Sequence, residues 1–393
     1  MAIRQRAKNG GNLDKPNRMK KNLIVFGTRP EAIKMIPLLK KFEENTSVFE
    51  TKVCVTAQHR EMLDQVLDFF DVVPDFDLDL MKPNQNLYSL TADIIRELKN
   101  VLDDFSPDYI YVHGDTTTSM AAAIAGFYKG AKVCHIEAGL RTFNKHSPFP
   151  EEMNRQLVGR IADYHFAPTE DSKKNLLIEN VPSDHILVTG NTVIDALEYS
   201  SCKILSYSND EIEKLKSIVD PEKKVILVTG HRRENHGQGF INICNALRIL
   251  AEENDDLQII YPVHLNPNVR ETVYQILDNS KNIYLIDPLS YPAFVWMMKH
   301  SYIILTDSGG VQEEAPSLGK PVLVMRDTTE RPEAVEVGTV VLVGSNTDKI
   351  VNETTKLLRD SQYYHKTSEI HNPYGDGKAS QRIVDFVSNL KLF

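Results

Sequence analysis

The sequence predicts an α/β protein made of two doubly wound domains with a cleft between them. Its 393 residues exceed the usual length of one domain, which is about 100–200 residues. Short apolar runs rich in Val, Ile and Tyr alternate with longer stretches of helical period, a pattern typical of parallel sheets buried on both faces. The runs fall into two sets of six, which are too many for a single barrel of eight strands.

The predicted strands are short, and helical patterns separate them. The first set is expected at 22–26, 52–56, 109–112, 132–136, 165–167 and 186–188, and the second at 225–228, 257–261, 282–286, 302–306, 321–324 and 340–343. Helices are expected at 31–44, 61–70, 87–103, 239–253 and 349–359, and a breaker cluster at 371–377 precedes a terminal helix at 379–390.

We place the domain boundary near Gly190, after the last strand of the first set. The N-terminal domain then covers 20–190 and the C-terminal domain 191–373, and the helix of segment 374–393 is able to pack back on the N-terminal domain. Residues 1–20 hold six Lys or Arg and one Asp, with almost no apolar content. We interpret 1–19 as a leader that is disordered or was added for expression, with an Arg-rich transit peptide as the alternative.

Composition excludes several classes of protein. The net charge of −9 argues against a general nucleic-acid binder. No apolar run approaches the ~18 residues of a membrane span. The four cysteines lack the spacing of metal ligands or of a redox motif, and we interpret them as free thiols in a reducing compartment. We therefore expect a cytoplasmic protein without nucleic-acid or membrane partners and without a metal.

In the first half, charged residues stand where predicted strands end. Arg29 and Lys34 follow the first strand at a helix start, which favours an anion. Asp115 follows the predicted strand 109–112, Glu137 follows the predicted strand 132–136, and Glu151 opens another helix. Taken alone, Asp115 also fits a helix cap, and Glu151 fits a first-turn acid favoured by the helix dipole. Because the carboxyl ends of parallel strands meet at one crevice, we expect these groups to converge.

The second half repeats this arrangement. His231 follows one strand, and Ser308, Gly309 and Gly310 follow another, at the start of the helix that carries Glu314. Two glycines at a helix start allow a phosphate to approach bare backbone N–H groups. GxxxxGK[ST], GxGxxG after a first strand, HExxH and GxSxG are all missing. The residues alone predict a phosphorylated ligand bound between domains, with carboxylates and a histidine near it.

Eleven segments, among them FGTRPEAIKM (26–35), VHGDTTT (112–118), IEAGLRT (136–142), TGHRRE (229–234) and LTDSGGVQEEAP (305–316), carry a more specific signal. In this order they resemble the non-hydrolysing UDP-N-acetylglucosamine 2-epimerases of bacteria, over about residues 20 to 390. The resemblance implies a GT-B-like architecture of two Rossmann-like domains, the C-terminal one binding UDP, and a homodimer. It also implies reversible conversion of UDP-GlcNAc to UDP-ManNAc without metal or NAD, feeding ManNAc into surface polysaccharides.

The chemistry implied by the resemblance is elimination of UDP to give 2-acetamidoglucal, followed by readdition with the C2 proton delivered to the opposite face. Such a reaction needs acid–base groups at C2 and cationic groups for the departing UDP. Asp115, Glu137 and Glu151 match the family's carboxylates around C1 and C2, and His231 matches its partner near the diphosphate. Which carboxylate removes the proton and which returns it stays open.

Further positions match the family's contacts to UDP and to a second ligand. The matching residues are Arg29 and Lys34 for the nucleotide or its phosphates, Phe294 for uracil, Ser308, Gly309 and Gly310 for the diphosphate, Glu314 for ribose, and Arg331 for a further UDP contact. Gln58 and His264 match a second site where UDP-GlcNAc acts as an allosteric activator. The rival functions are a GT-B glycosyltransferase, a hydrolysing epimerase and a nucleotide-sugar sensor; the three acids with His231 favour the epimerase.

Overall fold

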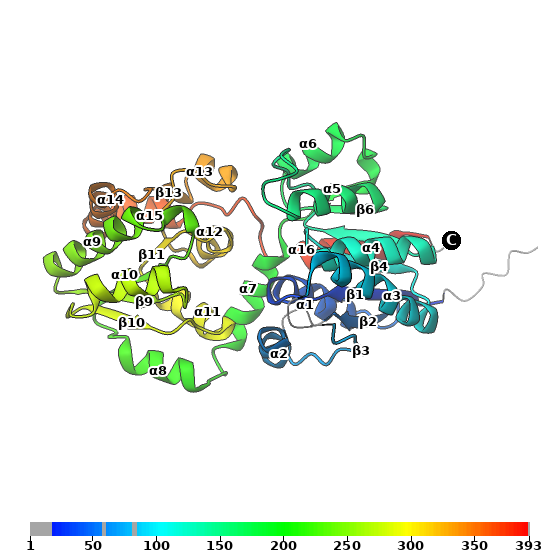
Figure 1. Ribbon diagram of the computed structural model, residues 1–393, viewed down its shortest axis with the longest axis horizontal. Coiled ribbons are helices and arrows are strands. Elements are labelled where there is room, and N and C mark those ends of the chain that lie inside the picture. The colour runs from blue at the N-terminus through cyan, green and yellow to red at the C-terminus, as the bar shows by residue number, and fades with distance from the viewer. Residues whose placement is uncertain (1–17, 57–59, 81–84, 392–393) are drawn as a thin grey trace, which may run out of the picture.

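The computed structural model describes residues 18–56, 60–80 and 85–391. Gln58 and residues 1–17 of the proposed leader lie outside these ranges. Two lobes each contain one parallel sheet covered by helices (Figure 1). The first sheet has seven strands in the order β3-β2-β1-β4-β5-β6-β7, and the second has six in the order β10-β9-β8-β11-β12-β13. The predicted fold class, two doubly wound α/β domains, is confirmed.

The strands and helices have the following bounds. The strands are β1 (Lys20–Phe26), β2 (Phe49–Val55), β3 (Phe76–Asp77), β4 (Tyr109–His113), β5 (Lys132–Ile136), β6 (Tyr164–Ala167), β7 (Ile186–Val188), β8 (Lys224–Thr229), β9 (Leu257–Pro262), β10 (Ile283–Ile286), β11 (Ile303–Thr306), β12 (Val322–Val324) and β13 (Val340–Leu342). The α-helices are α1 (Arg29–Glu43), α2 (Arg60–Phe69), α3 (Leu87–Phe105), α4 (Thr117–Lys129), α5 (Glu151–Ile161), α6 (Glu170–Ile178), α7 (Thr192–Lys203), α8 (Asp210–Ile218), α9 (Gln238–Glu253), α10 (Pro267–Leu277), α11 (Tyr291–His300), α12 (Gly309–Glu314), α13 (Pro332–Val337), α14 (Thr347–Arg359), α15 (Ser361–Ser368) and α16 (Ala379–Asn389).

The twelve predicted strands are all present, with ends shifted by at most a few residues, but six in the first half was one too few. The additional strand, β3, pairs with the end of β2 through Phe76 beside Cys54 and Asp77 beside Val55. Two residues are too short to show the alternation that identifies a strand from sequence. This edge strand forms because β2 supplies a hydrogen-bonding partner. The local sequence pattern does not show that such a partner is present.

Each sheet reverses its strand order at one point. β1 pairs with both β2 and β4, and β8 pairs with both β9 and β11, so the connections on either side run in opposite directions. Ligands of doubly wound folds bind outside the carboxyl ends of strands at such switch points. The loops after β1, β4, β8 and β11 are therefore the expected places for functional groups.

The ends of the second half return to the first lobe. In Figure 1 the green helix α7 lies between the lobes, and the red helix α16 lies against the N-terminal one. The buried Asp195 carboxylate of α7 accepts hydrogen bonds from the backbone N–H groups of Ala379 (3.2 Å) and Ser380 (2.7 Å), which start α16. Lys20 Nζ donates to the Val387 carbonyl at 2.7 Å. These contacts hold α16 on β1 and α7.

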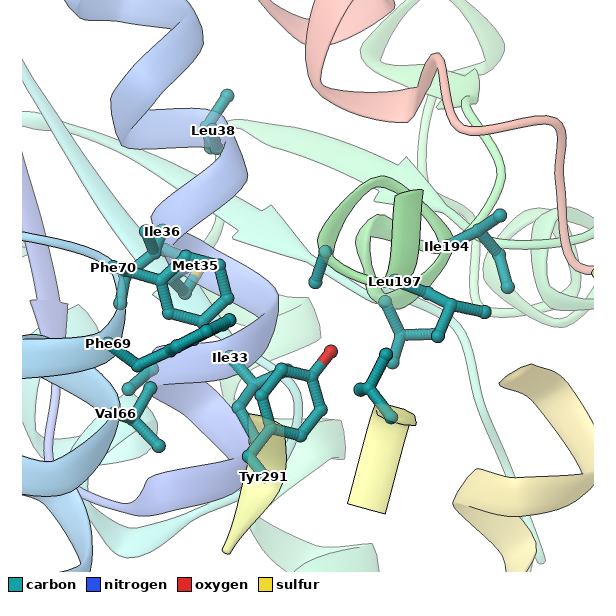
Figure 2. Packing of buried hydrophobic residues seen from close by; sticks show 14 of the residues in the cluster. Ile33, Met35, Ile36, Leu38, Val66, Phe69, Phe70, Ile194, Leu197 and Tyr291 are labelled. Carbon is teal, nitrogen blue, oxygen red and sulfur yellow. The ribbon is translucent and has the colours of Figure 1, made fainter. Parts of the chain in front are cut away.

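An apolar cluster joins the lobes beside the switch point of the first sheet. Tyr291 of α11 packs against Phe69 and Phe70 at the end of α2, with ring centroids 6.2 and 6.1 Å apart. Figure 2 shows these rings with Ile33 of α1 and Leu197 of α7 in the same cluster. Burial of such apolar surface stabilises the contact between lobes by roughly 25 cal/mol per Å².

Candidate active site

A cavity of about 580 Å³ lies beyond the carboxyl ends of β1, β4 and β5. Its walls come from both halves of the chain, because the segment between β12 and α13 closes one side. Lining residues with chemically active side chains include Lys34, His113, Asp115, Glu137, Arg155 and Arg331. Four of these were predicted from the sequence as site residues, and the structure brings those four together.

Glu137 is a carboxylate of this cavity with partners on several elements. It follows β5 with φ of +60°, a left-handed conformation that is uncommon for a residue with a side chain and concentrates at functional sites. Its Oε2 forms an ion pair with Lys34 Nζ and accepts a hydrogen bond from Asn191 Nδ2 at 2.7 Å. His113 Nε2 lies 3.7 Å from the same oxygen. Three different elements therefore hold this carboxylate.

The charges around Glu137 keep it ionised. Burial by itself would raise its pKa, but the charges of Lys34 and Arg331 outweigh burial and hold the pKa well below its ordinary value. Burial lowers the pKa of His113 to about 4, so this imidazole is neutral at pH 7. The pair at neutral pH is thus a carboxylate beside an uncharged imidazole, and neither group holds an added proton.

Asp115 is held by a different helix. It follows Gly114, whose φ of +61° allows the tight turn after β4. The Asp115 side chain forms an ion pair with Arg155 of α5, and its carbonyl accepts from Asn154 Nδ2 at 2.9 Å. The Arg155 guanidinium also lies 3.5 Å from the buried Glu152 carboxylate. A cation thus accompanies both Asp115 and Glu137, the two predicted carboxylates among those that line the cavity.

A second buried acid, Glu313, connects this cavity to the C-terminal lobe. Its carboxylate is 2% exposed, pairs with Arg331, and accepts from Asn191 Nδ2 at 3.1 Å. Lys34 Nζ lies 3.9 Å from it. Asn191 therefore donates to one carboxylate from each lobe, Glu137 and Glu313, and links the strand-end residues of the first sheet to α12.

Glu31 organises the loops after β1 and β4 from inside the protein. It is 1% exposed and accepts from the backbone N–H groups of Gly27 (3.1 Å) and Thr28 (2.8 Å). It also accepts from the hydroxyls of Thr116 (2.6 Å) and Ser119 (3.1 Å). Thr28 caps α1 and Thr116 caps α4, so one carboxylate couples both helix starts.

In the C-terminal lobe, predicted residues gather at the ends of β8 and β11. The His231 ring is stacked with that of His264, with centroids 5.6 Å apart. Ser308 precedes α12, whose first residues are Gly309 and Gly310. A Cβ placed on Gly309 would lie 3.9 Å from the Arg232 guanidinium and 4.0 Å from that of Arg331. The backbone N–H groups at the start of α12 and the guanidinium groups of Arg232 and Arg331 are therefore close to one another.

Arg29, Glu314 and Phe294 lie where the lobes meet. Burial lowers the pKa of Arg29 on α1, and the charge of Glu314 partly restores it. Burial, and next the charge of Glu313, raises the pKa of Glu314 to about 8. Within the described residues, Glu314 Oε2 has no hydrogen-bond partner. Phe294 of α11 is partly buried against the core that both lobes share.

Glu151 stands apart from this cavity. Glu151 is the first residue of α5, but it is not among the described residues that line the cavity. Three residues with close contacts, His113, Arg155 and Asn191, were not predicted as site residues. Each belongs to one of the eleven segments that carry the family resemblance, namely VHGDTTT (112–118), PEEMNR (150–155) and TGNTVIDAL (189–197). The resemblance did not show which side chains of these segments face the cavity.

Two parallel-sheet lobes with carboxylates, cations and histidines at their facing strand ends define a two-domain α/β enzyme of GT-B-like architecture. The family model described as UDP-N-acetylglucosamine 2-epimerase matches residues 40–388. The chain belongs to this family, and it is an isomerase of the non-hydrolysing type.

Individual relatives agree over nearly the whole chain. The UDP-N-acetylglucosamine 2-epimerase of Escherichia coli (strain K12) is 57% identical over 374 residues, covering 95% of this chain and 99% of that protein. The crystal structure of UDP-GlcNAc 2-epimerase from Neisseria meningitidis bound to UDP-GlcNAc has a TM-score of 0.83 at 54% identity, covering 93% of this chain and 99% of that one. The S. aureus MnaA–UDP structure has a TM-score of 0.82 at 47% identity, covering 94% and 96%.

Proposed function

We propose that this protein interconverts UDP-GlcNAc and UDP-ManNAc by eliminating UDP and adding it back. In the forward step a carboxylate takes the C2 proton, a C1–C2 double bond forms, and the C1–O bond to the diphosphate breaks. The intermediate is 2-acetamidoglucal. Readdition of UDP at C1, with a proton delivered to the opposite face of C2, gives the epimer. Atoms and electrons balance without an oxidant.

The observation that carries this proposal is the pair of cavity carboxylates, Asp115 and Glu137, each held by its own cation. Positioned acids and bases accelerate proton transfer typically 10²–10⁴-fold. Epimerisation needs one group to remove a proton and one to return it on the other face, and two separately held carboxylates suit that need. Which of the two removes the proton is left open, as is the role of Glu151.

The departing diphosphate needs positive charge and N–H donors. We assign this role to His231, to the start of α12 at Ser308, Gly309 and Gly310, and to Arg331. Arg29, Phe294 and Glu314 are assigned to the nucleoside. Lys34 is assigned chiefly to Glu137, with which it is paired, and through that pair to the sugar end of the ligand.

The test is to incubate the protein with UDP-GlcNAc in D₂O and follow the mixture by NMR. We expect deuterium at C2 in both UDP-GlcNAc and UDP-ManNAc, with little free ManNAc. Since elimination is redox-neutral, we propose that NAD is not required. Because cationic side chains are assigned to the diphosphate, we propose that no metal is required either, and EDTA should leave the rate unchanged. A glycosyltransferase or a sensor would give no C2 exchange, and a hydrolysing enzyme would accumulate free ManNAc.

We also propose a second UDP-GlcNAc site that activates the enzyme. Its support is the stacking of His264 on His231, since the resemblance matches His264 to the second site and His231 to the catalytic one. Rates should depend sigmoidally on UDP-GlcNAc, and the reverse reaction from UDP-ManNAc alone should show a lag. A hyperbolic dependence without a lag would contradict this site.

The proposed enzyme is a homodimer that works in the cytoplasm and supplies ManNAc for surface polysaccharides. Support for the dimer comes from exposed apolar side chains on the neighbouring helices α4 and α5, namely Phe127, Tyr128, Met153 and Leu157. Patches of this kind on a protein surface commonly mark interfaces. Among the described residues, no helix has the length and apolar character needed to cross a bilayer.

A further inference from the structure

The residue that faces the His231 ring from the neighbouring strand end is Asp307. Its carboxylate is fully buried directly after β11. Asp307 Oδ2 accepts hydrogen bonds from the backbone N–H groups of His231 and Arg232, both at 2.8 Å. These two bonds set the plane of the carboxylate. As a result, the direction of the second oxygen is also set.

That second oxygen, Asp307 Oδ1, points at the imidazole. It lies 3.3 Å from His231 Nδ1 and has no hydrogen-bond partner among the described residues. A buried acceptor left unpaired is destabilising, and more so when it is charged. A small rotation of the His231 ring would align an Nδ1–H with this oxygen. The His264 ring is stacked against one face of the imidazole.

We propose that Asp307 is a positioning residue that holds His231 with its Nδ1–H toward Oδ1, so that Nε2 faces the diphosphate of the nucleotide sugar. The assignment of His231 to the diphosphate rests on the proposed function; the Asp307–His231 pairing does not. A carboxylate that orients a catalytic imidazole and stabilises its cation is a recurrent arrangement in enzymes.

The pairing determines what His231 can do during elimination. With Nδ1 already protonated, the next proton is bound at Nε2, and the resulting cation donates Nε2–H to a phosphate oxygen as the C1–O bond breaks. When UDP adds back to C1, the Nε2 proton is held by the imidazole again. Burial, together with Arg232 and His264, lowers the pKa of His231, whereas Asp307 raises it. Among the described residues named here, Asp307 is thus the group that favours the cationic form of His231.

The first test needs no substrate, and a variant serves only to assign the signals. The wild-type protein is labelled with ¹⁵N in its histidine rings, and the His231 signals are assigned by their absence in His231→Gln. We expect Nδ1 to carry the proton in the neutral ring. Finding the proton on Nε2 with Nδ1 bare would overturn the pairing, whatever reaction the enzyme catalyses.

The second test is Asp307→Asn. The amide oxygen can still accept the two backbone N–H bonds, which leaves an NH₂ group facing His231 Nδ1 where an acceptor stood. We expect kcat for C2 exchange to fall about 10²- to 10⁴-fold, by analogy with the same change in serine-protease triads. KM should stay nearly unchanged, and the limb of the pH–rate profile that reports His231 should move to lower pH.

A double variant separates positioning from a general structural role. If Asp307 acts through His231, adding Asp307→Asn to His231→Gln should cause little further loss, since residues acting as a unit are not additive. An equally large loss in both backgrounds would overturn the proposal. Should Asp307→Asn fail to fold, the ring-nitrogen result decides. If no C2 exchange occurs in the wild type, the proposed function fails while the tautomer result still tests the pairing.

Discussion

His113 Nε2 lies 3.7 Å from Glu137 Oε2, where the neighbouring strands β4 and β5 end. The imidazole nitrogen is buried and has no hydrogen-bond partner within the described residues. Because the pKa of His113 is lowered to about 4 and that of Glu137 is also lowered, neither group holds an added proton at pH 7. A proton taken up by Glu137 would therefore lie next to the uncharged imidazole of His113.

Replacing His113 should slow C2 exchange without abolishing UDP binding. The matched pair is His113→Asn, which keeps a polar group near Nδ1 only, and His113→Gln, which keeps one near Nε2. We expect exchange to fall at least about tenfold in the asparagine variant, given the usual size of acid–base effects, and to be better retained in the glutamine variant. Equal rates in both variants would show that Nε2 is not used.

Amide variants of the cavity carboxylates should separate chemistry from binding. We expect Asp115→Asn and Glu137→Gln each to reduce C2 exchange by about 10³-fold or more, while UDP affinity measured by calorimetry changes little. Glu137→Gln should also lose about 2 kcal/mol of unfolding free energy, because the partly buried Lys34 loses its nearest counter-charge. Loss of folding together with activity would favour a purely structural role.

Asn191→Asp tests how much the protein depends on having a neutral donor between the carboxylates of the two lobes. Asn191 caps α7 through its side-chain oxygen, and aspartate caps equally well. The donor that serves Glu137 and Glu313 would become a third carboxylate, so we expect a loss of about 2–4 kcal/mol in unfolding free energy at pH 7. The loss should shrink at pH 5, where a proton relieves the repulsion. Asn191→Ser, which adds no charge, should lose less and show no such pH dependence.

Glu314 should make the protein less stable at alkaline pH. Burial, and next Glu313, raises its pKa from 4.5 to about 8, so between these pH values the folded state binds more protons than the unfolded chain. Its contribution to stability is complete below pH 4.5 and is lost as pH rises through 8, at up to about 1.4 kcal/mol per pH unit. We expect Glu314→Gln to gain melting temperature relative to wild type between pH 6 and 9. The exposed Glu336→Gln should track wild type at every pH.

The proposed dimer can be tested on α4. Tyr128 is 75% exposed and Phe127 is 63% exposed. We expect Tyr128→Glu to shift the sedimentation-equilibrium mass from that of a dimer toward that of a monomer, because a charge at an apolar interface is costly. Ile178→Glu, which changes a residue of α6 that is 70% exposed, is the matched control and should leave the dimer intact. A wild-type monomer at micromolar concentration would contradict the proposal.

Much of the site could be located from the sequence because parallel strands end at a common edge. A residue that directly follows an apolar strand, as Asp115 and Glu137 do, must stand at that edge whatever the helices do. The same reasoning placed His231 and Ser308 at the ends of β8 and β11. It failed for the two-residue strand β3, which depends on a neighbour rather than on its own pattern.

The fold class, the twelve longer strands and the family could be predicted from the amino-acid sequence, since these follow from periodicity and from motifs in order. Which side chains become partners depends on the packing of the folded chain. Lys34 lies 103 residues from Glu137, Asn191 lies 54 from it, and Asp307 lies 76 from His231. Such pairs depend on how helices pack between strand ends and how two lobes meet, and burial then decides which charges are retained. Neither this packing nor this burial can be predicted from the spacing of residues along the chain.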